Sequence, residues 1–172
     1  AQGLCGVTQV VLMGMGEPLH NYPAVSRAID WFSSAQGFQF SPRRITVSTV
    51  GIVPKIEQLV HDHPQVRLAV SLHSAITETR NSIVPINQHH SIEDLSEVLV
   101  KIRDGSRRIS IEYVVLPGIN DGPDQAKALA RFAGKGGAHI NLLPFHPYEG
   151  ALYAAAGAAE EGQFLSLGQK QY

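Results

Sequence analysis

Cysteine is almost missing from this sequence of 172 residues, in which Cys5 is the only one. A single thiol cannot form a disulfide within the chain, and a cytosolic setting is therefore the default expectation. Zinc sites and iron–sulfur clusters that are built from several cysteines are excluded for these residues as well.

Long apolar runs and an excess of charge of one sign are also missing. No apolar stretch approaches the roughly 20 residues that span a bilayer, and the first residues lack the positive region of a signal peptide. We therefore expect no membrane partner and a cytoplasmic location. The formal net charge is −1, so charge alone does not indicate a nucleic-acid-binding protein.

What is present is a regular alternation of short apolar runs with helical patterns. The runs are rich in β-branched residues and nearly continuous, which is typical of strands buried on both faces. They are Val10–Met13, Ile45–Thr49, Leu68–Leu72, Ile109–Leu116 and Ile140–Leu143. Alternation of this kind predicts an α/β fold with a parallel sheet and right-handed crossovers, as an open sheet or a partial barrel.

The helical patterns carry recognisable start and stop signals. We expect Asn21 and Ser91 to cap two helices, and Pro54 and Asp124 to lie near the start of two others. The last helix is expected to end at the glycines Gly134, Gly136 and Gly137. We assign residues 1–153 to one core domain and residues 154–172 to an irregular or frayed helical tail.

Polar and glycine residues stand where several of these runs end. Gly14, Gly16 and Glu17 follow the first run. The second run contributes Ser48, the end of the third contributes Ser71 and His73, and the fifth contributes Asn141. Ligands of parallel α/β folds bind at the carboxyl ends of the strands. Each residue alone has an ordinary structural explanation, but together they predict a binding site at one rim of the sheet.

Six segments then resemble, in order and spacing, the radical S-adenosylmethionine methyltransferases that modify an adenine of large-subunit ribosomal RNA and of some transfer RNAs. They are VVLMGMGEPL from Val10, FSPRRITVSTVGIVP from Phe40, LAVSLHS from Leu68, RNSIVPIN from Arg80, ISIEYVVLPGINDGPDQAKALA from Ile109 and INLLPFHPYEG from Ile140. The resemblance covers about residues 7–153. It implies a partial (β/α)6 barrel of the TIM type, of which this chain would hold strands two to six.

The resemblance also implies the cofactors and their contacts. It assigns S-adenosylmethionine to residues at the strand ends, namely Gly16, Glu17, Ser48, Ser71, Leu72, His73 and Asn141. It assigns no catalytic and no metal-binding residue to this chain. The family's four-iron, four-sulfur (4Fe-4S) cluster is held by a C-x-x-x-C-x-x-C loop that Cys5 does not match, so the cluster is expected only in the complete enzyme.

We therefore expect a fragment, truncated at both ends, of an RNA methyltransferase that is inactive alone. Carbon 2 of an adenine in 23S ribosomal RNA is the expected target; carbon 8 and transfer RNA stay open. Two alternatives also stay open. One is a catalytically dead remnant that binds a nucleoside, and the other is a metal-dependent hydrolase or aldolase barrel that uses Glu17, His73, Glu112 and His146. We further expect the exposed strand Val10–Met13 to promote self-association.

Overall fold

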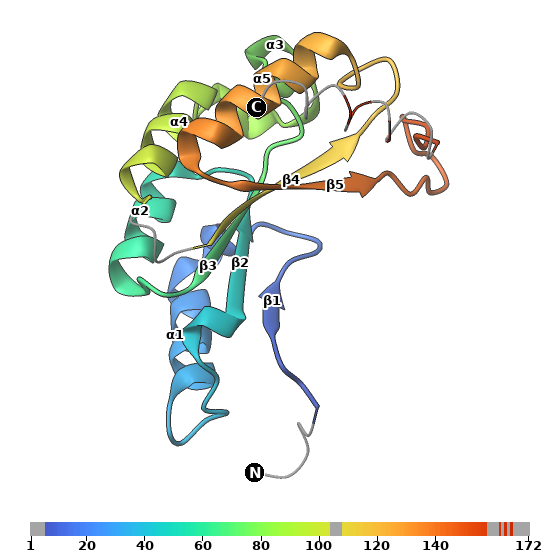
Figure 1. Ribbon diagram of the computed structural model, residues 1–172. Helices are drawn as coiled ribbons and strands as arrows, with labels where there is room; N and C mark the ends of the chain where they lie inside the picture. Colours follow the sequence, from blue (N-terminus) through green and yellow to red (C-terminus); the bar gives the residue numbers. More distant parts are fainter. Residues whose placement is uncertain (1–5, 104–107, 158–161, 163, 165, 167–172) are drawn as a thin grey trace.

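A five-stranded parallel sheet forms the centre of the fold (Figure 1). The computed structural model describes residues 6–103 and 108–157 together with Gly162, Phe164 and Ser166, so Cys5 lies outside the described part. The strands follow one another across the sheet in chain order. They are β1 (Val10–Leu12), β2 (Ile45–Thr49), β3 (Arg67–Ser71), β4 (Ile109–Val115) and β5 (His139–Pro144). The predicted strands and their parallel order are confirmed, to within one residue at each end.

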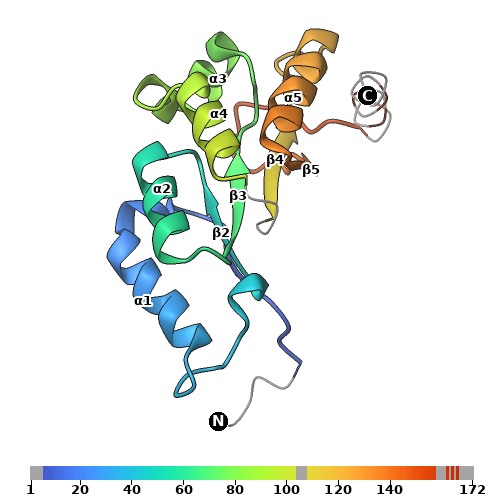
Figure 2. The same cartoon turned by 60° about the vertical axis from the view of Figure 1, so that its left-hand side comes forward.

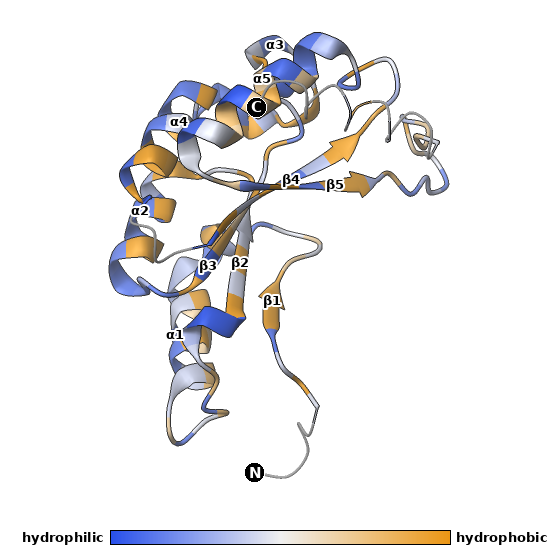
Figure 3. Cartoon of the chain, viewed as in Figure 1, coloured by the Kyte–Doolittle hydropathy of each residue, from blue (hydrophilic) through white to orange (hydrophobic). Residues whose placement is uncertain are grey.

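Helices connect the strands and lie along one side of the sheet (Figures 1 and 2). The α-helices are α1 (Tyr22–Ser33), α2 (Val53–Asp62), α3 (Thr77–Ile83), α4 (Ile92–Lys101) and α5 (Pro123–Gly136), and three short 3-10 turns are η1 (Pro18–Asn21), η2 (Pro42–Arg44) and η3 (Pro85–Gln88). In Figure 3 apolar and polar residues alternate along the helices, as expected where one helix face is buried. Within the described residues, none of the helices combines the length and apolarity that crossing a membrane requires.

The two faces of the sheet differ because side chains alternate along each strand. On β4 the residues Ile109, Ile111, Tyr113 and Val115 are buried in the core with the helices. Ser110 and Glu112 stand between them and therefore point to the opposite face. The helix-covered face thus holds the apolar core, and on β4 the other face carries the polar side chains of Ser110 and Glu112.

Two expectations about the helix ends are wrong. The Asn21 side chain makes no capping hydrogen bond at the start of α1. A 3-10 turn precedes the helix instead, and its cap is Glu17, whose carboxylate accepts from the Leu19 N–H. At the end of α5, Gly134 and Gly136 are helical, and only Gly137 takes the left-handed conformation that ends the helix, with φ 61°. The expected Ser91 cap is confirmed, since its side chain accepts from the Asp94 N–H at 3.1 Å.

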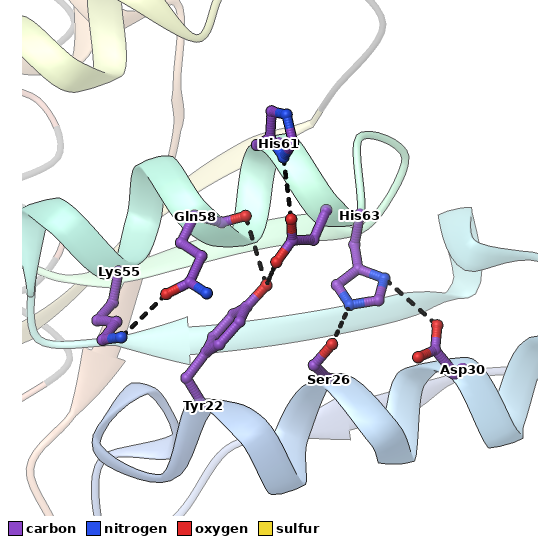
Figure 4. A network of polar contacts seen from close by, with 8 residues as sticks. Tyr22, Ser26, Asp30, Lys55, Gln58, His61 and His63 are labelled. Atoms are coloured by element: carbon purple, nitrogen blue, oxygen red, sulfur yellow. Dashed lines mark hydrogen bonds and ion pairs between the residues drawn. The ribbon is translucent and has the colours of Figure 1, made fainter.

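Helices α1 and α2 are joined by polar contacts as well as by apolar packing (Figure 4). The buried Tyr22 ring directs its hydroxyl to Asp62 Oδ2 at 2.6 Å. One turn further on, Ser26 Oγ and His63 Nε2 are 2.8 Å apart. The network lies on the outer, helical side of the fold and fixes how α1 packs on α2.

Most of the tail after residue 157 lies outside the described residues, so the frayed helix or coil expected there stays a prediction. Phe164 is described, and it is buried in the core. Its ring stacks on Tyr113 of β4 with the ring centroids 5.3 Å apart. Ala156 also packs against this core, so the tail contributes to it at both positions.

Candidate functional site

The loop after β1 carries the two glycines and the carboxylate that the sequence singled out. Gly14 and Gly16 have φ angles of 115° and 91°, a region in which other residues are strained. Glu17 follows and accepts two backbone hydrogen bonds, from Leu19 N at 2.9 Å and from Val50 N at 2.8 Å. Its carboxylate therefore ties this loop to the end of β2, and its remaining lone pairs can accept from a ligand.

A row of polar side chains crosses the open face of the sheet from β2 to β5. We call Ser48, Ser71, Glu112 and Asn141 the polar row. Ser48 Oγ lies 3.4 Å from Ser71 Oγ. Ser71 pairs in register with Glu112, and Glu112 pairs with Asn141, so these three side chains share one face. The predicted residues Ser48, Ser71 and Asn141 are thus brought together, with Glu112 between them.

Leu72 and His73 follow β3 in the chain and do not belong to the polar row. The Leu72 side chain is fully buried in the apolar core, so it does not line the open face. His73 has a positive φ of 57°, which is uncommon outside glycine. Its Nδ1 accepts the N–H of Val114 at 3.1 Å. Because Nδ1 is the acceptor, a neutral His73 carries its proton on Nε2.

The charge state of His73 follows from its surroundings. Burial, and secondarily the nearby Arg80 guanidinium, lower the pKa of His73 to about 4. The imidazole is therefore neutral at physiological pH, and its Nε2–H is a donor. Asn120 fixes the backbone here, since its amide nitrogen donates to the His73 carbonyl at 2.7 Å.

Sequence reasoning missed two residues that organise this site. Arg80 is fully buried, and it donates to the carbonyls of Leu72 and Val50 at 3.1 and 2.5 Å and to Asn87 Oδ1 at 2.7 Å. Burial lowers its pKa to about 10. It joins the segments that follow β2 and β3. Glu112, weighed earlier only as a metal ligand, is 5% exposed. A charged residue inside the apolar run ISIEYVV was the available signal for it.

A hollow of about 510 Å³ lies on the open face of the sheet next to part of the polar row, and Ser48 and Ser71 are not among its lining residues. Glu112 and Asn141 line it together with Thr46, Arg67, Arg108 and His139. In the described part of the chain, no three His, Cys, Asp or Glu side chains gather as a metal site would require. The metal-dependent alternative, with Glu17, His73, Glu112 and His146, finds no support in that part. The hollow itself offers acceptor oxygens from Glu112 and Asn141 and donors from Arg67 and Arg108.

Comparison with known proteins gives a consistent set of relatives. No family model matches the chain. The chain is 37% identical over 165 residues to "Probable dual-specificity RNA methyltransferase RlmN" of Moorella thermoacetica, and 44% identical over 163 residues to "Dual-specificity RNA methyltransferase RlmN" of Parvibaculum lavamentivorans. These alignments cover 95% and 94% of this chain. The chain spans less than half of each relative, 47% and 41% of their lengths.

Solved structures agree with these relatives. A radical SAM methyltransferase from Sphaerobacter thermophilus superposes with a TM-score of 0.90 at 36% identity, covering 96% of this chain and 49% of that chain. A domain of a pyruvate-formate lyase-activating enzyme from Bacteroides vulgatus superposes with a TM-score of 0.70 at 15% identity, which supports the fold alone. The α/β fold is thus the parallel-sheet fold of these radical SAM structures.

Proposed function

We propose that this chain forms the S-adenosylmethionine-binding part of an RlmN-type RNA methyltransferase. The reason is that it is similar to such enzymes over almost its whole length. The observation that carries the proposal is the polar row on the open face of the sheet together with Glu17 in the loop after β1. Relatives with 37% and 44% identity are named dual-specificity RNA methyltransferases. We propose carbon 2 of an adenine in 23S ribosomal RNA as the target, with transfer RNA as a second substrate and the cytoplasm as the location.

The chemistry of the residues fits the proposed cofactor. S-adenosylmethionine carries an ammonium group, ribose hydroxyls and an adenine amino group, all of which are hydrogen-bond donors. Glu17, Glu112 and Asn141 supply acceptor oxygens, and Gly16 lets the backbone approach a ligand closely. His73 adds a neutral N–H donor for an acceptor atom of the ligand. These groups bind and orient the cofactor, whereas the bond-breaking chemistry belongs to the cofactors themselves.

The residues do not fit an iron–sulfur cluster of the family's kind. Such a cluster needs three thiolates of a C-x-x-x-C-x-x-C loop, and Cys5 is the only cysteine in the sequence. No step through a cluster is therefore assigned to this chain. The proposed share of these residues is to hold S-adenosylmethionine at the open face of the sheet.

The proposal is tested by comparing binding with turnover. Calorimetry should detect S-adenosylmethionine binding to the purified chain, while 23S ribosomal RNA stays unmethylated under reducing conditions with iron and sulfide supplied. Glu17→Gln removes a charged acceptor worth about 1.5–3 kcal/mol, so affinity should fall by about tenfold or more. Because Glu17 also bonds the Val50 N–H, a thermal melt must accompany each titration.

The results of these experiments distinguish the proposed function from its alternatives. Equal binding by the unmodified chain and by Glu17→Gln would show that Glu17 does not meet the ligand. Methylation by the 172 residues alone would overturn the view that they are only the cofactor-binding part. The second candidate function is a nucleoside-binding protein without catalysis. It predicts that binding persists but that a chain extended with the relatives' cluster loop still fails to methylate RNA.

A further inference from the structure

Glu112 is an ionisable group inside the sheet and must have hydrogen-bond donors there. Its side chain projects from β4 on the open face of the sheet and is 5% exposed. Ser110 Oγ donates to Glu112 Oε1 at 2.7 Å, and Asn141 Nδ2 donates to the same oxygen at 3.0 Å. Burying a charged carboxylate is unfavourable unless such donors are provided. Ser110 and Asn141 supply these donors.

The contact with Asn141 has a consequence for the polarity of the site. An ionised carboxylate only accepts, so Asn141 must turn its amide nitrogen toward Glu112. The amide oxygen, Oδ1, is then the atom left for a ligand. Among the described residues, neither Asn141 Oδ1 nor Glu112 Oε2 receives a hydrogen bond. Both residues line the hollow of about 510 Å³, which is thus presented with two neighbouring acceptors.

We propose that Glu112 is a positioning and specificity-determining residue that holds the Asn141 amide so that the two residues offer only acceptors to a ligand. The ligand chemistry that fits is a pair of adjacent neutral donors, which in an adenosine cofactor is the ribose diol. A cationic donor fits less well because Arg67 and Arg108 line the same hollow. The inference rests on the proposed cofactor function and assigns one part of the cofactor to one pair of residues.

The amide geometry predicts what substitution does. In Glu112→Gln two amides face each other, and only an N–H paired with an oxygen gives a hydrogen bond. Whichever way the pair turns, one of the two groups that face the hollow becomes an N–H donor. In the double variant Glu112→Gln/Asn141→Asp, the glutamine N–H donates to the new carboxylate. Acceptors alone then face the hollow again.

Adenosine and 2′,3′-dideoxyadenosine, which differ only in the two ribose hydroxyls, are the probes. Calorimetry on the full chain should show adenosine binding at least about tenfold more tightly than the dideoxy compound. Glu112→Gln should remove most of this preference, and the double variant should restore it. Glu97→Gln, the same change at an exposed site on α4, is the control and should leave the preference intact.

The results distinguish this inference from the proposed function. An unchanged preference in Glu112→Gln, with S-adenosylmethionine still bound, would overturn the inference alone. Failure of the unmodified chain to bind either adenosine or S-adenosylmethionine would overturn both. A second measurement needs neither a ligand nor a variant, so misfolding of a variant cannot affect it. The Asn141 side-chain amide protons of the unmodified chain should show slowed exchange with solvent in NMR spectra, and fast exchange would also contradict the inference.

Discussion

At the scale of single residues, the carboxyl ends of β2 and β3 depend on one buried cation. Arg80 has no carboxylate partner among the described residues and is balanced by the carbonyls of Val50 and Leu72 and by Asn87. Carbonyl dipoles and an amide oxygen satisfy its N–H groups without neutralising its charge. The remaining positive charge helps to keep the neighbouring His73 neutral. One residue thus shapes the backbone and sets the electrostatics of the rim.

The lowered pKa of His73 predicts how stability depends on pH. The folded state holds His73 near pKa 4, whereas an unfolded histidine titrates near 6.5. Between these values the unfolded chain binds more protons than the folded chain, so the free energy of unfolding increases with pH. The stability that the neutral His73 contributes is therefore complete above about pH 6.5 and is lost as the pH falls to about 4. The loss attributable to this group is at most about 3 kcal/mol.

Urea unfolding at several pH values between 4 and 7.5 measures this effect. His73→Asn keeps a residue that tolerates the left-handed backbone and removes the titration. Its stability should therefore depend less steeply on pH than that of the unmodified chain. His89→Asn, at an exposed histidine, should keep the original slope. Parallel pH profiles for the unmodified chain and His73→Asn would contradict the assignment.

At the scale of elements, the strands were predictable and one helix was not. Each strand contains a short, mostly apolar run, and such a run can be recognised in the sequence without knowledge of the tertiary structure. Helix α3 (Thr77–Ile83) was missed because it is short and has no apolar stripe. Its buried residue is Arg80, whose partners lie 7, 8 and 30 positions away in the sequence. Such a helix is specified by its tertiary partners, which no local pattern reveals.

Some features of the candidate site were also predictable from the sequence, and others were not. Residues at the strand ends were predictable because parallel strands bring their carboxyl ends to one edge. The pairing of Glu112 with Asn141 was not, since it depends on the register between β4 and β5. The buried side chain of Leu72 and the backbone bonds of Glu17 also depend on how loops pack. Contact residues of the cofactor remain predictions that binding experiments must decide.

The packing of α1 on α2 gives a prediction at this scale. Burial, and the bond to Asp62, raise the pKa of Tyr22, so its hydroxyl stays protonated and donates to Asp62 at 2.6 Å (Figure 4). Tyr22→Phe removes this hydrogen bond and should lower stability by about 1 kcal/mol, because the acceptor is partly exposed to solvent. Thermal unfolding measures the change. Tyr148→Phe, at an exposed tyrosine, is the control, and an equal loss in both variants would refute the role of the contact.

At the scale of the whole molecule, the sheet is covered on one side only. The described helices lie along its outer side (Figure 2). The polar row and the hollow lie on the opposite, open face. The edges of the sheet are β1 and β5. This one-sided arrangement leaves the proposed cofactor site open to a ligand. It also leaves strand edges with unpaired backbone groups, which can pair with another chain.

The edge at β1 predicts self-association of the isolated chain. Among the described residues β1 pairs only with β2, and Val11 and Met13 at this edge are 54% and 47% exposed. Light scattering after size-exclusion chromatography should give a mass above that of one chain, increasing with concentration. Val11→Lys places a charge on the edge, which disfavours strand pairing, and should shift the population toward monomer. Val100→Lys adds the same charge at an exposed site on α4 and should not. A monomer at high concentration, or equal dissociation by both variants, would show that the β1 edge does not drive association.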